Sequence, residues 1–129
     1  DASTVVTLVN QTNGNLVVNQ TFDSGGIVTS GSWALNDNLI LLGLINGSVI
    51  VLTNNPTTGS LIPIQVINTT HTDGVGEIVG RASRFVTCGS DDSINVYYFN
   101  LTSSQYQLNQ SIPGVVTSGC VALDFSVSE

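Results

Sequence analysis

Short runs of β-branched, aromatic and other apolar residues recur along the whole chain, and Gly, Asn, Asp or Ser bounds each of them. Runs of this length are typical of β-strands, and the apolar spacing of an amphipathic helix is missing almost everywhere. Pairs such as Asn46-Gly47 supply turn residues that tolerate positive φ. The pattern predicts an all-β fold of eleven strands, over residues 4–9, 16–22, 27–35, 39–44, 49–53, 61–67, 75–79, 84–88, 94–99, 106–111 and 115–125.

The chain also repeats itself. Residues 3–21 (STVVTLVNQTNGNLVVNQT) align without a gap on residues 93–111 (SINVYYFNLTSSQYQLNQS). The two segments are 90 residues apart, and half of this spacing is also visible, because Ser3, Ser48 and Ser93 follow one another at intervals of 45 residues. A unit of about 45 residues holds four short strands. We therefore expect a single repeat segment made of a partial unit (1–25), two complete units (26–70 and 71–113) and the start of a fourth (114–129).

Composition narrows the possible partners. Charged residues make up 9% of the chain, Arg81 and Arg84 are its only basic residues, and the net charge is −7. Binding to phosphate backbones needs Lys and Arg, so we expect no nucleic acid partner. The longest apolar run is strand-sized, so we expect no membrane insertion. Because the sequence starts without Met and shows no signal peptide, we expect a mature or excerpted segment.

Two features indicate a secreted, extracellular or cell-surface protein. The two cysteines form an even count without the spacing of a metal site. Acceptor motifs for N-glycosylation, Asn-x-Ser/Thr, are frequent, and the repeat alignment keeps two pairs of them in register. We expect covalent N-linked glycans at these asparagines: Asn10, Asn19, Asn46, Asn68, Asn100 and Asn109.

The segment CGSDDSINVYYF, residues 88–99, resembles the part of a WD-repeat propeller blade that joins its second and third strands. In that family an Asp occupies the turn, a Ser or Thr follows two residues later, and the next strand ends near Trp. Asp91, Ser93 and Tyr97 match these positions, and His71 resembles the histidine of the family's Gly-His pair. The resemblance implies propeller-like, four-stranded antiparallel blades and a structural hydrogen-bond network of these four residues. A β-sandwich is the alternative fold.

The resemblance also bears on the cysteines. It places Cys88 at the end of the second strand of one blade and Cys120 in the first strand of the next, where the two strands face each other. We therefore expect a disulfide between them, with two buried free thiols as the alternative.

The candidate chemistry is sparse. His71, the only histidine, could act as a base beside Asp73 or Asp91, but no GxSxG motif supplies a nucleophile. The adjacent Asp91 and Asp92 could bind Ca²⁺, but the alternating ligands of a calcium loop are missing. We therefore expect no enzyme, no metal and no cofactor apart from covalent glycans.

These observations favour an extracellular, glycosylated structural protein that self-assembles into repetitive or filamentous structures. Its expected partners are copies of itself or flanking units of a longer chain, because exposed sheet edges and unfinished units invite pairing. The alternative is a recognition module whose loops bind a protein or carbohydrate ligand.

Overall fold

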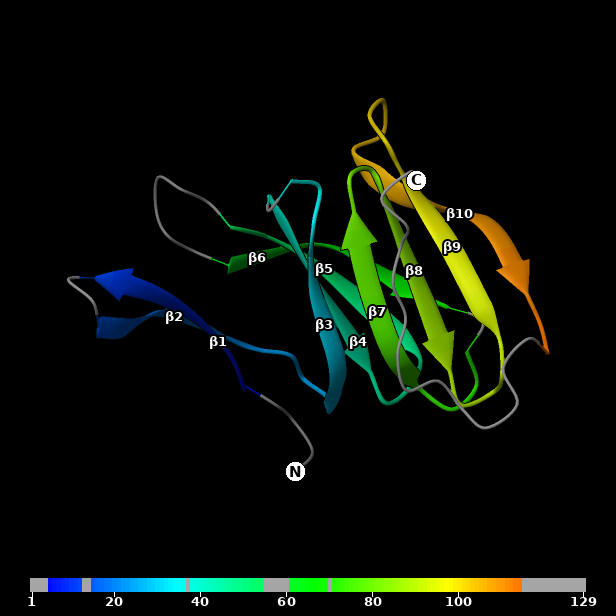
Figure 1. The fold of residues 1–129 in the computed structure, drawn as a ribbon, viewed down its shortest axis with the longest axis horizontal. Helices are drawn as coiled ribbons and strands as arrows, with labels where there is room; N and C mark the ends of the chain where they lie inside the picture. The colour runs from blue at the N-terminus through cyan, green and yellow to red at the C-terminus, as the bar shows by residue number, and fades with distance from the viewer. Residues whose placement is uncertain (1–4, 13–14, 37, 55–60, 70, 115–129) are drawn as a thin grey trace.

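The computed structural model describes residues 5–12, 15–36, 38–54, 61–69 and 71–114, and these form ten β-strands and no helix (Figure 1). The all-β prediction is therefore confirmed. The ten strands correspond to the first ten predicted strands, and the eleventh, over 115–125, lies outside the described residues.

The strands form one hairpin and two four-stranded sheets, all antiparallel. The hairpin consists of β1 (Val5–Thr12) and β2 (Asn15–Asp23). The first sheet follows the chain order, with β3 (Val28–Ala34), β4 (Leu39–Leu44), β5 (Ser48–Asn54) and β6 (Leu61–Asn68). The second sheet does the same, with β7 (Val75–Arg81), β8 (Arg84–Gly89), β9 (Ile94–Asn100) and β10 (Gln105–Ile112).

The two sheets share one strand register. Every pairing in the first sheet except Ser48 with Asn68 recurs in the second after a shift of 47 residues in the first strand and 45 in the other three. Leu42 pairs with Ile50, for example, and the equivalent residues Thr87 and Asn95 pair with each other. The sheets are therefore two copies of one supersecondary unit, and they lie within residues 26–70 and 71–113.

The last strand of each unit carries a β-bulge at the same repeat position. In β2, β6 and β10 the register skips one residue, which is Asn19, Ile64 and Asn109 respectively. These positions lie 45 residues apart. A bulge bends the strand and leaves its extra residue unpaired, so it is a specific feature of a strand. Its recurrence indicates that the β1–β2 hairpin corresponds to the last two strands of a unit.

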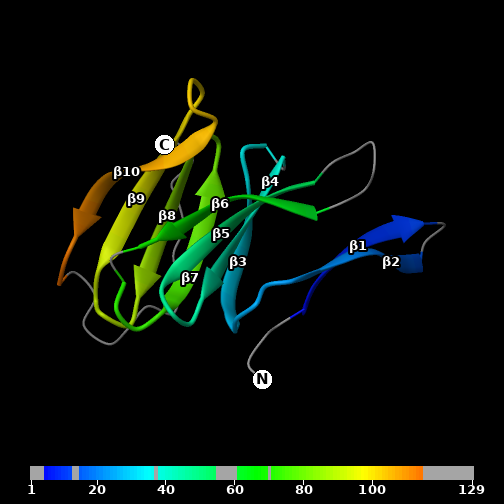
Figure 2. The ribbon, with the colours of Figure 1, turned by 180° about the vertical axis from the view of Figure 1, so that it is seen from behind.

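The sheets pack face to face around the main hydrophobic core (Figure 2). Three aromatic rings of the second sheet lie at its centre: Phe85 stacks on Tyr97 with 4.6 Å between ring centroids and meets Tyr106 edge-on at 4.7 Å. Such geometries add to the burial of apolar area. The first sheet contributes five buried side chains to this core: Ala34, Leu39, Leu41, Val49 and Val51.

Hydrogen bonds join the two sheets where β3 lies beside β7 (Figures 1 and 2). The hydroxyl groups of Thr29 and Ser30 both donate to the carbonyl oxygen of Val75. The amide of Gly80 donates to Ser32 Oγ at 2.9 Å. A Cβ at Gly80 would lie 2.5 Å from the carbonyl oxygen of Trp33, so only glycine allows this approach.

A second connection joins the far edges of the sheets. Gln65 on β6 donates from Nε2 to the carbonyl oxygen of Tyr106 (2.9 Å), and its Oε1 accepts from the Tyr106 amide (2.8 Å). The Gln65 carboxamide thereby hydrogen-bonds both the amide and the carbonyl of Tyr106, as the backbone of a neighbouring strand would.

The resemblance to WD-repeat propeller blades is wrong. The described residues form two separate four-stranded sheets and a hairpin, and these do not close into a ring. The physical reason is that a 45-residue period reports only a repeated four-stranded meander, and it does not determine how successive sheets stack. Two antiparallel sheets packed face to face are consistent with the β-sandwich alternative.

Candidate functional site

The most concentrated polar cluster begins in the turn between β8 and β9. Asp92 adopts a φ of 63°, a left-handed conformation that Asp tolerates better than most residues, and its amide donates to the carbonyl of Gly89 at 3.2 Å. The neighbouring Asp91 turns its carboxylate inward, where Oδ1 accepts from the Ser93 hydroxyl (2.8 Å) and from the Ser93 amide (3.3 Å). The paired aspartates therefore have different tasks.

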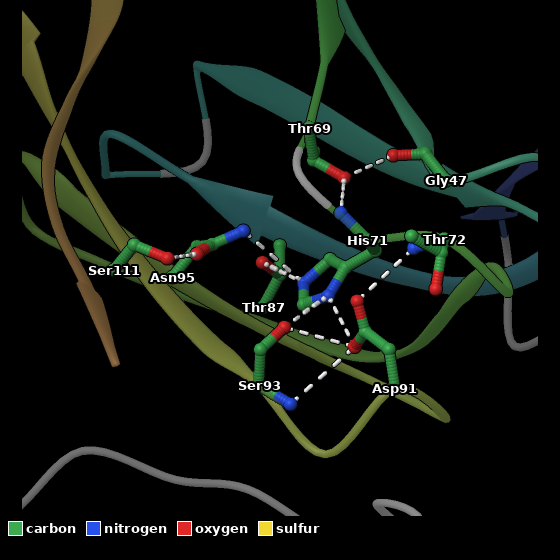
Figure 3. Close-up of polar contacts among 9 residues, drawn as sticks. All are labelled: Gly47, Thr69, His71, Thr72, Thr87, Asp91, Ser93, Asn95 and Ser111. Carbon is green, nitrogen blue, oxygen red and sulfur yellow. Dashed lines mark hydrogen bonds and ion pairs between the residues drawn. The ribbon is translucent and has the colours of Figure 1, made fainter. Parts of the chain in front are cut away.

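His71 lies at the centre of this cluster (Figure 3). Its Nδ1 is 3.0 Å from Asp91 Oδ1 and 3.0 Å from Ser93 Oγ. Its Nε2 is 2.8 Å from Thr87 Oγ1 and 3.5 Å from Asn95 Nδ2. The His71 side chain is fully buried, so every polar contact of the ring is made with the protein.

The cluster also holds the segment that joins β6 to β7, which runs from the end of β6 at Asn68 to Val75 and which we call the connector. Thr69 accepts from the His71 amide at 3.1 Å and donates to the carbonyl of Gly47. The amide of Thr72 donates to Asp91 Oδ2 at 3.0 Å. A Cβ at Gly47 would collide with the carbonyl oxygen of His71, which explains the glycine there. The turn of the second sheet, the connector and the turn of the first sheet are thus tied together.

The partners of the imidazole indicate where its proton lies. Because the Asp91 carboxylate can only accept, we assign the proton to Nδ1, and Nε2 then accepts from the Thr87 hydroxyl. Burial favours the neutral form of Asp91, but hydrogen bonds from His71, Ser93 and Thr72 outweigh it and lower the pKa of the Asp91 carboxyl. The cluster therefore favours an ionised Asp91.

Thr87, His71 and Asp91 follow the order hydroxyl, imidazole, carboxylate, which is the order of a hydrolytic triad. Thr87 is completely buried, however, so its hydroxyl does not meet solvent or a substrate in this conformation. The geometry instead suits a cluster that fixes two turns and a connector through satisfied, buried hydrogen bonds.

The structure brings together three of the four predicted network residues. The fourth, Tyr97, packs in the core against Phe85. Its burial raises its pKa to about 12, although a hydrogen bond with Asn95 opposes the rise. Asn95 in turn accepts from Ser111 at 2.6 Å, so it extends the cluster to β10.

Two members of the cluster, Thr87 and Asn95, were missed by the sequence analysis. Both lie on the core-facing side of their strands, because Thr87 is two residues from Phe85 and Asn95 is two residues from Tyr97. A polar residue at a position that strand alternation assigns to the core was the available signal.

The predicted glycosylation sites lie at strand ends, at turns and at the bulges, apart from Asn10, which is paired within β1. Asn46, Asn68 and Asn109 are exposed, and Asn100 is half-buried. Asn10 belongs to β1 and Asn19 is the bulge residue of β2, but their side chains are outside what the structure describes. Glycosylation stays a prediction at all six.

Of the cysteines, Cys88 is fully buried at the end of β8 and is not a free thiol. Cys120 lies outside the described residues, so the Cys88–Cys120 pairing stays a prediction.

Within the described ranges, no three Asp, Glu, His or Cys side chains gather as a metal site would need. No part of the chain that the structure describes forms a helix able to span a bilayer.

Comparison with known proteins adds no family. No family model matches the sequence, and no curated protein matches it.

Proposed function

We propose that this chain is a structural module of a secreted glycoprotein and that it works by stacking its sheets on further copies of the same unit. The observation that carries the proposal is the way the two sheets meet. The core buries one face of the first sheet, formed by residues such as Leu41 and Val51. The equivalent residues of the second sheet are Val86 and Val96. They lie on the face that points away from the core, because the face toward the core carries Phe85 and Tyr97.

The contact is therefore heterologous. We call the face with Leu41 and Val51, or Val86 and Val96, face A, and the other face of each sheet face B. Face A of the first sheet packs on face B of the second. Each sheet thus has one further face of the kind that its neighbour buries, although Val86 and Cys88 on face A of the second sheet are themselves buried. A heterologous contact of this type extends to further copies without any new kind of interface.

Face B of the first sheet has exposed apolar side chains that support such a contact. Val66 pairs with Ile50 and is 59% exposed, and Trp33 pairs with Ile40 and is 44% exposed. Exposed apolar side chains beside a buried cluster are typical of interaction surfaces. Leu42, Leu44, Ile50 and Leu52 form that buried cluster, and Phe22 of β2 packs against it.

The composition supports a glycosylated, extracellular setting. A chain without lysine and with 9% charged residues presents few charged side chains, and glycans at exposed asparagines would add polar surface. Intact-mass analysis before and after deglycosylation tests this part, and non-reducing peptide mapping tests the Cys88–Cys120 disulfide. Six unmodified acceptors in protein from a secretory host would contradict the extracellular part of the proposal.

Sedimentation velocity over a wide concentration range tests the stacking itself. We expect association that Val66→Glu weakens about tenfold or more, because the contact would bury the new carboxylate. Leu101→Glu is the matched control, since Leu101 is 83% exposed in the β9–β10 turn and lies on neither face. A wild-type protein that stays monomeric throughout, or equal effects of the two variants, would contradict stacking and favour a recognition module.

A further inference from the structure

The last strand of each unit is an edge strand, and β10 is the least protected by its own sequence. All of its residues from Gln105 to Ser111 are exposed except Tyr106, and its sequence QYQLNQSI contains no charged residue and no proline. Gln65 pairs the backbone of Tyr106 only. A long, uncharged edge of this kind is a template for pairing with another chain, and Gln and Asn side chains strengthen such pairing.

The repeat units differ in how they could block pairing of another chain with the edge strand, and the difference lies at the bulge and the residue before it. The residue before the bulge is Pro63 in β6, and its equivalent in β10 is Leu108: Pro63 pairs with Leu52, and Leu108 with Tyr97. Proline on an edge strand blocks further pairing because it has no amide to donate. In β10 the bulge residue itself, Asn109, is a glycosylation acceptor, and in β2 the bulge residue Asn19 is one too. The strand with proline has Ile64 at its bulge.

We propose that a glycan on Asn109 caps the edge of β10 and so restricts association to the faces of the sheets, as Pro63 does for β6. By the repeat, a glycan on Asn19 has the same role on β2. The inference rests on the proposed function, because it needs a secreted, glycosylated protein. It goes further in assigning separate roles to the acceptors on the edges and to those at turns and strand ends.

The geometry at Asn109 suits this modification. The residue is exposed, and among the described residues no hydrogen bond holds its carboxamide. A transferase forms the bond between Asn109 Nδ2 and the anomeric carbon of a lipid-pyrophosphate-linked oligosaccharide. The bond between that carbon and the pyrophosphate oxygen breaks, the lipid pyrophosphate leaves with the electron pair, and Nδ2 loses one proton. The resulting sugar would stand at the middle of the edge.

Other acceptors would leave the edge open. Asn100 ends β9 and its Oδ1 accepts from the Thr102 amide at 2.9 Å, so it belongs to the β9–β10 turn. Asn46 lies in the turn before β5, where Oδ1 accepts from the Ser48 amide at 2.9 Å. Removal of either glycan lowers the total carbohydrate without uncovering the strand. These acceptors therefore provide matched controls.

The test compares Asn109→Gln with Thr102→Ala, which removes the acceptor at Asn100 and leaves Asn100 itself in place. Both variants are made in the Val66→Glu background, which suppresses stacking through face B. Glycan occupancy is measured by mass spectrometry, and association by pelleting together with the infrared band of intermolecular β-sheet. We expect Asn109→Gln to raise the pelleted fraction and the band several-fold, and Thr102→Ala to leave both unchanged.

A rescue variant makes the test specific for the edge. Asn109→Gln/Leu108→Pro gives β10 the proline that β6 has at this position, and Leu108 is 49% exposed. We expect this double variant to stay as dispersed as the parent. Equal association in Asn109→Gln and Thr102→Ala, no association in either, or no rescue by proline would overturn the inference. So would an unoccupied Asn109 in a protein glycosylated elsewhere, whereas six unoccupied sites would also contradict the proposed function.

Discussion

The two sheets have the same register, but they fill equivalent core positions with opposite chemistry. In the first sheet, Leu42 and Ile50 form an apolar cluster on face B. In the second sheet, the equivalent Thr87 and Asn95 are completely buried beside the imidazole of His71. One backbone unit therefore tolerates either filling, provided that each buried polar atom has a partner. The strand register therefore follows the repeat. Whether the buried positions are apolar or polar depends on the neighbouring connector, because only the connector with His71 offers hydrogen-bond partners to Thr87 and Asn95.

The turns repeat the comparison on a smaller scale. Asn46-Gly47 in the first sheet and Asp91-Asp92 in the second occupy equivalent positions, and both place a residue of positive φ second. The side-chain oxygens of Asn46 and Asp91 each accept from the amide two residues later. Only the second turn holds a carboxylate, and only that carboxylate accepts from a histidine. The charge therefore belongs to the histidine cluster and not to the turn geometry.

Replacing the histidine should break this comparison most strongly. His71→Leu removes one of the partners of Asp91 Oδ1 and the imidazole partner of the Thr87 hydroxyl, which is completely buried. We expect a loss of about 3 kcal/mol in the free energy of unfolding, measured by urea denaturation. Adding Thr87→Val should recover part of the loss, because it removes a buried hydroxyl without a partner. A single variant as stable as the wild type would show that the cluster is not a stabilising feature.

The next largest effect concerns the contact between the sheets. Trp33 and Gly80 occupy the same repeat position, but Trp33 lies on face B of the first sheet and Gly80 lies where the sheets touch. Gly80→Ala places a Cβ 2.8 Å from that of Ala34, and we expect a loss of about 2 kcal/mol in the free energy of unfolding.

Gly31→Ala is the matched control for this substitution. A Cβ at Gly31 meets its nearest atoms at 3.5 and 3.7 Å, which is ordinary contact, so we expect a change of less than about 1 kcal/mol. Equal losses in the two variants would indicate that the cost comes from the strand and not from the contact between the sheets.

Much of the architecture could be predicted because it depends on local sequence. Strand alternation and turn residues predicted the ten described strands, and the 45-residue period predicted two equal units. The turn chemistry around Asp91 and Ser93 could also be predicted, since the two residues lie only two positions apart in the chain. These features need no knowledge of how the sheets pack.

The remainder depends on contacts between distant residues. The stacking of the sheets could not be predicted, because both faces of the first sheet are apolar and either could have met the second. The pairing of Gln65 with the Tyr106 backbone crosses from one sheet to the other, and no local pattern indicates it. The resemblance to propeller blades failed for the same reason, since it added a stacking geometry that the repeat alone does not contain.

The smallest expected effect is a difference in pH dependence between the two turns. Asp91→Asn gives the second turn the carboxamide of Asn46, so the turn can still accept from the Ser93 amide but loses its charge. Charge-assisted hydrogen bonds are stronger than neutral ones, so we expect the variant to be about 1 kcal/mol less stable than the wild type near pH 5. Urea denaturation at several pH values measures this gap.

The sign of the pH effect follows from the direction of the pKa shift. The pKa of Asp91 in the folded protein lies below its ordinary value of 3.8, because hydrogen bonds from His71, Ser93 and Thr72 outweigh the cost of burial. The stability that the carboxylate adds is therefore complete above about pH 3.8, and it is lost as the pH falls through the lower folded value. Other carboxyl groups titrate in both proteins, so they cancel in the gap between wild type and variant. That gap should shrink toward zero in acid, and a gap that stays constant or widens between pH 4 and 2 would show that the ionised form of Asp91 does not stabilise the cluster.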